Sequence, residues 1–275
     1  MIFSLLIKKK IILLTGATDG IGKQTAFALA EMGAILLMHG KDKVKGQKIR
    51  SEIILKTGNS NVSYFNADFT SFDDIKKLSD KIHSDFSHID ILINNAGVYE
   101  NNKIILDSGI EKSFMVNHLA PFLLTLQLLD LLNKSESARI INVSSMIHAS
   151  NIDFENLNGE KYYSGVNAYS LSKLCNILFT NELSDILKSE SITVNCLHPG
   201  VINTKLLRAG WSGFGDFTSE GADRIVYLSE SDAVEGVSGK YFMNDKITES
   251  APISHNAEVM KRLWDISLEY SNNKQ

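Results

Sequence analysis

Short apolar runs alternate along the chain with longer stretches in which apolar residues recur at helical spacing. The apolar runs predict buried β-strands, at residues 10–15, 34–38, 62–67, 89–93, 139–143, 192–196 and 240–243. The stretches between and after them predict helices, at residues 20–32, 42–56, 71–86, 108–133, 167–189, about 215–229 and 257–270. Strands that alternate with helices in this way form a parallel sheet covered on both faces.

Capping residues support the predicted helix boundaries. Asp42 is placed to cap one predicted helix, and Ser71 and Asp74 have the spacing of a capping box before another. No linker rich in Pro, Gly or Ser and no internal repeat interrupts the pattern. We therefore predict a single domain, residues 1–275, with an α/β doubly wound fold of about seven parallel strands.

The composition is that of an ordinary globular chain and excludes several function classes. Hydrophobic residues make up 44% and charged residues 22% of the 275 residues, which excludes a disordered or collagen-like chain. The net charge of −4 gives no broad electrostatic footprint for nucleic acid. Cys175 and Cys196 are too few for a disulfide framework, and the seven histidines show no metal-site spacing. We expect no nucleic-acid partner and no metal.

The start of the chain is apolar over residues 1–7, before Lys8, Lys9 and Lys10. A membrane span needs about 20 apolar residues, and a secretory signal carries its charges before the apolar run. No other stretch has the length and lack of charge of a membrane span. We expect a soluble, cytoplasmic protein without a stable membrane span, and the alternative is that residues 1–7 touch a membrane surface.

The turn after the first predicted strand has the glycine spacing of a phosphate site. It reads Thr15-Gly16-Ala17-Thr18-Asp19-Gly20-Ile21-Gly22. The glycines let the backbone approach a pyrophosphate, and the helix that starts at Gly20 points free N–H groups at it. Because the turn follows a strand and opens a helix, it predicts a dinucleotide site of the Rossmann type. The expected contacts are Gly16, Thr18, Asp19, Gly20, Ile21 and Gly22.

The end of the second predicted strand bears on the choice of dinucleotide. NAD sites usually have an acidic residue there, which binds the ribose hydroxyls. This chain has His39-Gly40-Lys41, and Lys41 can pair with a 2′-phosphate. Asp42 is close enough to be the acidic ribose ligand instead, although helix capping also explains it. We therefore predict NADP as the cofactor, with NAD as the alternative.

Together with later motifs, this pattern resembles the short-chain dehydrogenase/reductase family. The motifs occur in the family's order: Thr-Gly-x3-Gly-x-Gly at residues 15–22, Asn94-Asn95-Ala96-Gly97, Asn117, Ser144-Ser145, Tyr169-x3-Lys173 and Pro199-Gly200. The chain is most similar to the retinol dehydrogenase-like branch, which includes relatives of protochlorophyllide reductase, through residues 20–26, 117–125, 174–180 and 261–267. The resemblance implies an NAD(P)-dependent oxidoreductase that acts between alcohols and carbonyls.

Two features depart from that branch. Its animal members often carry an N-terminal membrane anchor, whereas the apolar start here is seven residues long. Lys41 stands where the branch often has arginine. The resemblance therefore supports the chemistry better than it supports retinol as the substrate.

A tyrosine and a lysine four residues apart supply candidate acid–base chemistry. Tyr169 and Lys173 share one face of a predicted helix, and a nearby ammonium and the positive nicotinamide ring favour the phenolate. Tyr169 can then exchange a proton with a carbonyl or alcohol oxygen. Ser145 can hydrogen-bond that oxygen, whereas strand alternation turns Ser144 away. The resemblance implies that Asn117 orders a proton-relay water and that Lys173 also holds the nicotinamide ribose.

Further cofactor contacts are expected at the carboxyl ends of strands, where open α/β sheets bind ligands. By resemblance, Asp68 meets the adenine ring. The remaining expected contacts are Asn95, Ala96 and Gly97 near the adenosine ribose, Pro199 and Gly200 beside the nicotinamide, and Thr204 at its carboxamide or the phosphates.

Two segments beyond these motifs indicate the substrate. The insertion at residues 146–167 should form a wall beside the cleft, with Phe154, Leu157, Tyr162 and Tyr163. The glycine-rich loop at residues 201–217 can close as a lid over an apolar substrate, with Leu206, Leu207, Trp211, Phe214 and Phe217. We predict an apolar aldehyde, ketone or alcohol, including retinoid-like compounds.

Two functions of different class fit the motifs. The first is an NADP-dependent oxidoreductase that transfers hydride between nicotinamide and a carbonyl or alcohol. The second is a dinucleotide-binding sensor or scaffold without turnover, against which Ser145, Tyr169, Lys173 and Asn117 argue together. The resemblance also implies a possible homodimer through residues 108–133 and 167–189, although relatives of the branch can be monomeric.

Overall fold

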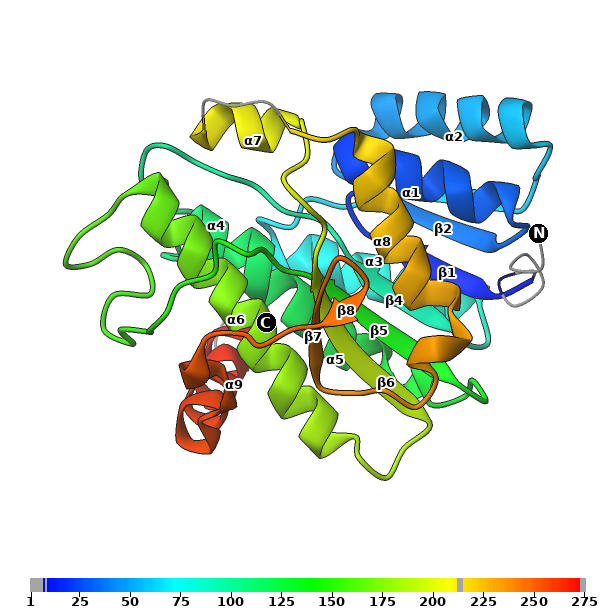
Figure 1. Cartoon of the computed structure of the whole chain (residues 1–275). Helices are drawn as coiled ribbons and strands as arrows, with labels where there is room; N and C mark the ends of the chain where they lie inside the picture. Colours follow the sequence, from blue (N-terminus) through cyan, green and yellow to red (C-terminus); the bar gives the residue numbers. More distant parts are fainter. Residues whose placement is uncertain (1–6, 8, 212–214, 273–275) are drawn as a thin grey trace.

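A central sheet of eight strands organises the chain, in the order β3-β2-β1-β4-β5-β6-β7-β8 (Figure 1). The structure is a computed structural model that describes residues 7, 9–211 and 215–272. The strands are β1 (Ile11–Leu14), β2 (Ile35–Gly40), β3 (Val62–Asn66), β4 (Ile91–Asn94), β5 (Ala138–Val143), β6 (Ile192–His198), β7 (Lys240–Met243) and β8 (Lys246–Ile247). β1 to β7 pair in parallel, which confirms the seven predicted strands and the α/β class.

The prediction lacked the antiparallel strand β8, which pairs with β7. Two residues are too few to show an alternating pattern. The turn between β7 and β8 places Asn244 and Asp245 at positive φ, 51° and 60°. Tight hairpin turns favour this left-handed geometry, and Asn and Asp tolerate it better than most residues.

Helices cover both faces of the sheet (Figure 1). They are α1 (Gly20–Glu31), α2 (Lys43–Thr57), α3 (Phe72–Asp85), α4 (Lys112–Phe114), the π-helical turn η1 (Met115–Leu119), α5 (Ala120–Leu132), α6 (Gly165–Ile186), α7 (Lys205–Gly210), α8 (Thr218–Glu230) and α9 (Ala257–Asn272), with short 3₁₀ turns at η2 (Asp232–Val234) and η3 (Pro252–His255). The helix expected from residue 108 begins at Lys112, because the Glu111 side chain accepts a hydrogen bond from the Phe114 amide and so caps the helix.

Successive strand residues point to opposite faces and build two apolar cores. Ile12 and Leu14 pack with residues of α1, α2 and α8 on one face. Leu13, between them, packs with α3, α5 and α6 on the other. Full burial of all three side chains explains why β1 reads as one continuous apolar run.

The C-terminal helix α9 covers α5 and α6. Its Trp264 lies 5.1 Å from the ring of Phe122 in α5 and 6.2 Å from that of Phe179 in α6, measured between centroids. Met260 and Leu263 of α9 are buried in the same core. Part of the α5–α6 surface at which the sequence suggests a homodimer is therefore covered by the chain's own helix.

The segment Lys112–Leu132 is long and apolar enough to cross a membrane, judged by length and composition alone. No membrane span was predicted here, because the uncharged part of the segment, between Lys112 and Asp130, is shorter than a span. In the fold the segment runs through α4, η1 and α5, and most of its apolar part is buried. Leu124 and Leu128 lie fully inside the core, so packing within the fold accounts for its apolar character.

Candidate active site

A cavity of about 500 Å³ lies at the carboxyl ends of the central strands, where the strand order reverses between β1 and β4. Open α/β sheets bind ligands at such a switch point. Every residue predicted to contact the cofactor lines this cavity: Gly16, Thr18, Asp19, Gly20, Ile21, Gly22, Lys41, Asp68, Asn95, Ala96, Gly97, Tyr169, Lys173, Pro199, Gly200 and Thr204. Ser145 lines it as well.

The glycine turn leaves no room for side chains. Gly16 has a φ of +66°, and a Cβ there would lie 2.8 Å from the Cα of Ala96. A Cβ on Gly22 would lie 2.1 Å from the Gly16 carbonyl oxygen and 2.5 Å from the Asn95 Nδ2. The backbone of this turn is therefore packed directly against the segment that follows β4.

Two polar side chains join the ends of β1 and β4. The Thr15 hydroxyl accepts hydrogen bonds from the amides of Asn95 and Ala96, both at 3.0 Å. In return, the Asn95 Nδ2 donates to the carbonyls of Thr15 at 2.8 Å and Gly16 at 3.2 Å. These bonds join the glycine turn and the Asn-Asn-Ala-Gly segment into one continuous wall of the cavity.

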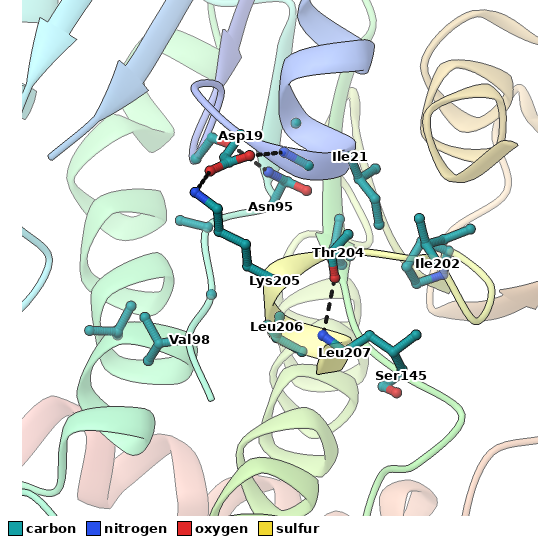
Figure 2. Close-up of a pocket in the computed structure, with 18 of the residues that line it drawn as sticks. Asp19, Ile21, Asn95, Val98, Ser145, Ile202, Thr204, Lys205, Leu206 and Leu207 are labelled. Atoms are coloured by element: carbon teal, nitrogen blue, oxygen red, sulfur yellow. Dashed lines mark hydrogen bonds and ion pairs between the residues drawn. The ribbon is translucent and has the colours of Figure 1, made fainter. Parts of the chain in front are cut away.

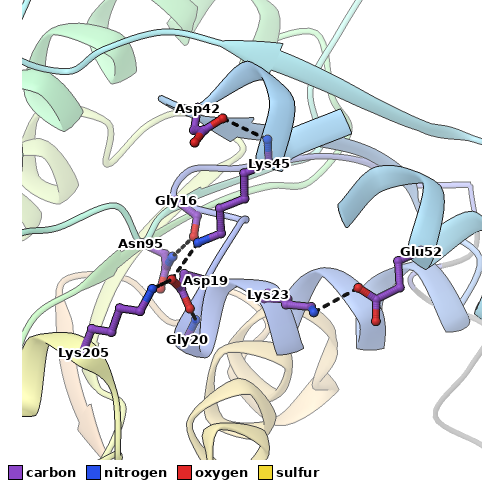
Figure 3. A network of polar contacts seen from close by, with 9 residues as sticks. All are labelled: Gly16, Asp19, Gly20, Lys23, Asp42, Lys45, Glu52, Asn95 and Lys205. Carbon is purple, nitrogen blue, oxygen red and sulfur yellow. Dashed lines mark hydrogen bonds and ion pairs between the residues drawn. The ribbon is translucent and has the colours of Figure 1, made fainter. Parts of the chain in front are cut away.

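Asp19, in the glycine turn, forms ion pairs with two lysines that also line the cavity (Figure 3). One oxygen of its carboxylate accepts from the Gly20 amide at 2.9 Å and caps α1. The other is 2.6 Å from the Lys45 Nζ in α2 and 2.9 Å from the Lys205 Nζ in α7. Partial burial acts to raise the pKa of Asp19, but the bonds from Lys45 and Lys205 hold it well below its usual range.

Two charged residues at the end of β2, Lys41 and Asp42, both line the cavity. Asp42 accepts a hydrogen bond from the Lys45 amide at 2.9 Å, as expected of a helix cap. The His39 Nε2 donates to the Ala67 carbonyl at 3.0 Å, and the imidazole stacks on Phe69. Burial lowers the pKa of His39 to about 4, so it is neutral near pH 7.

Tyr169 and Lys173 lie side by side on α6 and face the cavity. The Lys173 Nζ is 5.6 Å from the centroid of the Tyr169 ring and donates to the Val143 carbonyl at 2.7 Å. Burial raises the pKa of Tyr169 to about 12, although the Ser145 hydroxyl counteracts part of this. Burial also lowers the pKa of Lys173 to about 8. The phenol is therefore neutral near pH 7, whereas the prediction had its pKa lowered by Lys173 and the nicotinamide ring together.

The low pKa of Lys173 makes stability depend on pH. Between its folded value of about 8 and its ordinary 10.5, the unfolded chain binds more protons at this position, so the free energy of unfolding rises with pH. The full rise corresponds to roughly 3 kcal/mol. In urea unfolding between about pH 8 and 10, we expect this rise in the parent protein and its loss in Lys173→Met.

Lys173→Met also removes the bond to the Val143 carbonyl. That cost is the same at every pH, so only the slope reports the titration of Lys173. Equal slopes in the two proteins would contradict the lowered pKa.

The two serines after β5 both line the cavity, although Ser144 was predicted to turn away, and they differ in their hydrogen-bond partners. The Ser144 Oγ donates to the Lys173 carbonyl at 2.8 Å and so ties β5 to α6. The Ser145 Oγ accepts from the Ile147 amide at 3.1 Å and interacts with Tyr169. The Ser145 carbonyl is 2.8 Å from the Nδ1 of His148, whose Nε2 accepts from the Ala251 amide. These bonds fix the imidazole with its proton on Nδ1.

Asn117 does not line the cavity, unlike the other predicted catalytic residues. It is 1% exposed and lies in the π-helical turn η1. Its side chain exchanges hydrogen bonds with the backbone of Val98, at 2.7 and 3.0 Å, and also contacts the Ser172 hydroxyl. Its amide therefore braces the segment after β4 against α6, directly behind the cavity wall.

The predicted substrate loop contains a helix, α7, which carries part of the cavity wall (Figure 2). Leu206, Leu207 and Trp211 line the cavity, as expected, whereas Phe217 is 79% exposed and does not. Thr204 caps α7 through a bond from the Leu207 amide, so its hydroxyl already has a partner. Phe214 of the predicted loop, like residues 1–6 of the chain start, lies outside the described residues.

The insertion at residues 146–167 packs differently from the prediction. Met146 and Ile147 line the main cavity. The aromatic residues expected there lie elsewhere: Tyr162 and Tyr163, with Leu157, line a separate cavity of about 160 Å³, and Phe154 lies under Arg262 of α9. These aromatic residues of the insertion therefore lie outside the catalytic cleft, Phe154 against α9 and Tyr163 against the segment after β4.

Sequence reasoning missed three lysines that line the cavity, which are Lys45, Lys112 and Lys205. Lys45 lies in the first turn of α2, just after the capping Asp42. Its closeness in sequence to Lys41 was the one signal that could have indicated it. Lys205 is 186 residues from Asp19 in the chain, so no local pattern indicates their contact.

Comparison with known proteins agrees with this geometry. The family model for short chain dehydrogenases matches residues 10–212. The chain is 38% identical to retinol dehydrogenase 12 of Bos taurus over 270 residues, which cover 94% of this chain and 85% of that protein. It is 39% identical to retinol dehydrogenase 13 of Homo sapiens over 272 residues, which cover 93% and 82%.

Solved structures share the fold. An uncharacterized protein from Mycobacterium paratuberculosis superimposes with a TM-score of 0.81 and 27% identity, covering 97% of this chain and 94% of that one. A short chain dehydrogenase from Escherichia coli CFT073, in complex with NADPH, gives a TM-score of 0.71 and 25% identity over 87% of this chain and 98% of its own.

These relatives overturn the predicted cytoplasmic location, because retinol dehydrogenases 11 to 14 are membrane-associated. The prediction rested on the lack of a long uncharged apolar run. That criterion detects a membrane span and says nothing of other modes of association with a membrane.

The family match and the cavity now point to the same conclusion. The match spans most of the chain, from the strand before the glycine turn to the end of the α7 segment. The glycine turn, Ser145, Tyr169, Lys173 and the Pro199-Gly200 pair line one cavity, and Asn117 lies directly behind it. The chain belongs to the short-chain dehydrogenase family and is a retinol dehydrogenase-like, NAD(P)-dependent oxidoreductase.

Proposed function

We propose that the protein is an NADP-dependent oxidoreductase for an apolar aldehyde, ketone or alcohol, with retinoid-like compounds among its substrates. One observation carries this proposal. The glycine turn, the pair Tyr169 and Lys173, and the apolar side chains of α7 line a single cavity. A dinucleotide and a small apolar substrate would therefore meet beside a buried phenol.

The residues at the glycine turn fit a dinucleotide. The glycine turn lines the cavity at the start of α1, where free N–H groups attract a pyrophosphate. Lys41, Lys45 and Lys205 add positive charge to the same wall. A bound NADPH supplies a hydride donor, its nicotinamide ring, to the cavity.

Tyr169 acts as the proton donor in reduction and as the acceptor in oxidation. Its neutral phenol at pH 7 suits donation to a carbonyl oxygen as that oxygen gains electrons. The Ser145 hydroxyl hydrogen-bonds the same oxygen and stabilises the developing charge. Lys173 holds a positive charge beside the phenol and favours the phenolate that remains. Asn117 keeps the wall behind them in place.

Lys41 and Lys45 favour NADP, and Asp42, which lines the same cavity, accepts a hydrogen bond from the Lys45 amide as the cap of α2. A 2′-phosphate gains charge-assisted hydrogen bonds from such lysines. We expect Lys41→Ala and Lys45→Ala each to weaken NADPH binding by about tenfold and to leave NADH binding nearly unchanged. Fluorescence titration with both nucleotides measures this.

Lys48→Ala is the matched control, since Lys48 lies on the exposed side of α2 and does not line the cavity. It should bind both nucleotides as the parent does. Tighter binding of NADH than of NADPH by the parent protein would overturn the choice of NADP.

The apolar residues Leu206, Leu207 and Trp211 support an apolar substrate. We also propose that residues 1–275 work as one domain, in which residues 201–217 form the lid and the insertion 146–167 supports the cleft through Met146 and Ile147. A panel of retinoids, steroids, aliphatic aldehydes and quinones, followed by NADPH absorbance, tests the substrate class. Turnover confined to charged or highly polar carbonyls would contradict it.

A further inference from the structure

Three aromatic rings meet at the mouth of the catalytic cleft. The Trp211 ring, just after α7, lies 5.6 Å from the ring of Tyr169, between centroids. Tyr99, from the segment after β4, lies 5.0 Å from Trp211 and 5.9 Å from Tyr169. Trp211 and Tyr169 line the cavity, whereas Tyr99 lies behind Trp211. The indole is therefore the aromatic surface that a substrate would meet beside the catalytic phenol.

Two glycines make room for the Tyr99 ring, because a side chain at either position would collide with it. A Cβ on Gly210, the last residue of α7, would lie 2.8 to 3.1 Å from three ring atoms of Tyr99. A Cβ on Gly165, the first residue of α6, would lie 2.9 Å from the Tyr99 hydroxyl oxygen. The phenol thus fills a slot between the two helices that carry Trp211 and Tyr169, and it sets the distance between them.

Other bonds dock α7 against the same parts of the molecule. The Asn101 Nδ2 donates to the Ala209 carbonyl at 3.0 Å. Lys205 pairs with Asp19 across the cavity mouth (Figure 2). The Tyr163 hydroxyl donates to the Glu100 carbonyl at 3.1 Å, which supports the segment after β4 from behind. The position of Trp211 is therefore fixed from several sides.

We infer that Trp211 determines substrate specificity and that Tyr99 is its positioning residue. The substrate class is a carbonyl, or the matching alcohol, conjugated to a planar unsaturated or aromatic group. Such a group presents a flat π-surface to the indole, and aromatic contacts of this kind are favoured over contacts with saturated chains of equal length. This inference rests on the proposed function, because it concerns the substrate of the same site.

Paired substrates isolate the contribution of the indole. Cinnamaldehyde and its saturated counterpart, hydrocinnamaldehyde, differ in the planarity of the linker between ring and carbonyl. The ratio of their kcat/KM values is measured in the parent protein, in Trp211→Leu and in Trp211→Phe. Because intrinsic reactivity is the same for every variant, it cancels when the ratios are compared.

We expect Trp211→Leu to lower this ratio about fivefold, mainly through the KM of cinnamaldehyde, and Trp211→Phe to retain most of it. Tyr99→Leu should lower the ratio to a similar extent, and the double variant should lose little more, since Tyr99 acts through Trp211. Tyr162→Leu is the control, as this exposed ring lies outside the lid and lines only the smaller cavity. It should keep the parent ratio.

A second measurement reports binding directly. The chain has two tryptophans, Trp211 and Trp264, so the fluorescence lost in Trp211→Phe belongs to Trp211. Cinnamyl alcohol should quench that component in the parent protein. NADPH titration and thermal melting show whether each variant is folded.

The outcomes separate this inference from the function on which it rests. If the parent protein reduces neither aldehyde nor any member of the wider panel, the proposed function fails. If it reduces both and Trp211→Leu leaves the ratio unchanged, the function stands and the specificity role of Trp211 is wrong. Additive losses in the double variant would overturn the positioning role of Tyr99.

Discussion

Replacing Tyr169 by phenylalanine should lower turnover by about a thousandfold and leave NADPH binding within about twofold of the parent value. The change removes one hydroxyl from a buried ring and keeps the packing against Trp211 and Tyr99. Proton transfer is lost because the two groups beside the phenol are poor replacements: Lys173 donates to the Val143 carbonyl, and Ser145 is a much weaker acid. Initial rates and a fluorescence titration on the same preparation measure both quantities.

Tyr162→Phe is a suitable control, because Tyr162 is 56% exposed and lines the smaller cavity. It should retain parent activity. Turnover by Tyr169→Phe close to the parent value would show that the proton comes from another group.

Replacing Gly22 by alanine should abolish useful cofactor binding. The added Cβ would collide with the Gly16 carbonyl at 2.1 Å and with Asn95 at 2.5 Å, so the turn and the Asn-Asn-Ala-Gly segment must move. Loss of two charge-assisted hydrogen bonds to a phosphate corresponds to roughly 3–6 kcal/mol, and thus to at least a hundredfold weaker binding. Calorimetric titration with NADPH measures the change, and circular dichroism and thermal melting show whether the chain still folds.

Gly236→Ala provides the comparison. Gly236 also has a conformation that favours glycine, with a φ of +68°, but no atom lies within 4 Å of an added Cβ. Its replacement should lower the melting temperature slightly and leave NADPH affinity intact. Parent-like affinity in Gly22→Ala would contradict the role assigned to the turn.

The sequence was sufficient to predict the parts of the fold that depend on local patterns. Full burial on both faces makes β1 a continuous apolar run, so its existence could be read without tertiary information. The glycine turn was predictable for the same reason, because its spacing and its place after a strand both lie within one short segment. Tyr169 and Lys173 were predictable as a pair, since helical spacing alone puts them on one face.

The parts that sequence reasoning missed depend on contacts between distant segments. The helix α7 lies in a glycine-rich stretch, and its docking depends on Asn101, Tyr99 and Asp19, all far away in the chain. The aromatic residues of the insertion have no periodic pattern that would show whether they face the cleft or α9. Asn117 was recognised, but only the structure places its side chain on the backbone of Val98.

The raised pKa of Tyr169 also could not be predicted from the sequence. Sequence spacing suggested that Lys173 would lower it, and the effect of burial could not be judged before the depth of the cavity was known. Burial works on both members of the pair, raising the pKa of the phenol and lowering that of the amine. The neutral phenol is then a proton donor, whereas a phenolate would be an acceptor.

The central claim is that this cavity transfers hydride between NADPH and a carbonyl carbon. Isotope transfer tests it most directly: the protein is incubated with cinnamaldehyde or retinal and with NADPH deuterated on one or the other face of nicotinamide C4. We predict that deuterium from one of the two labelled cofactors appears on the carbinol carbon of the product alcohol, one atom per NADPH consumed, and that none appears with Tyr169→Phe. Alcohol without deuterium from either cofactor, or no alcohol from any carbonyl of the panel, would contradict the account.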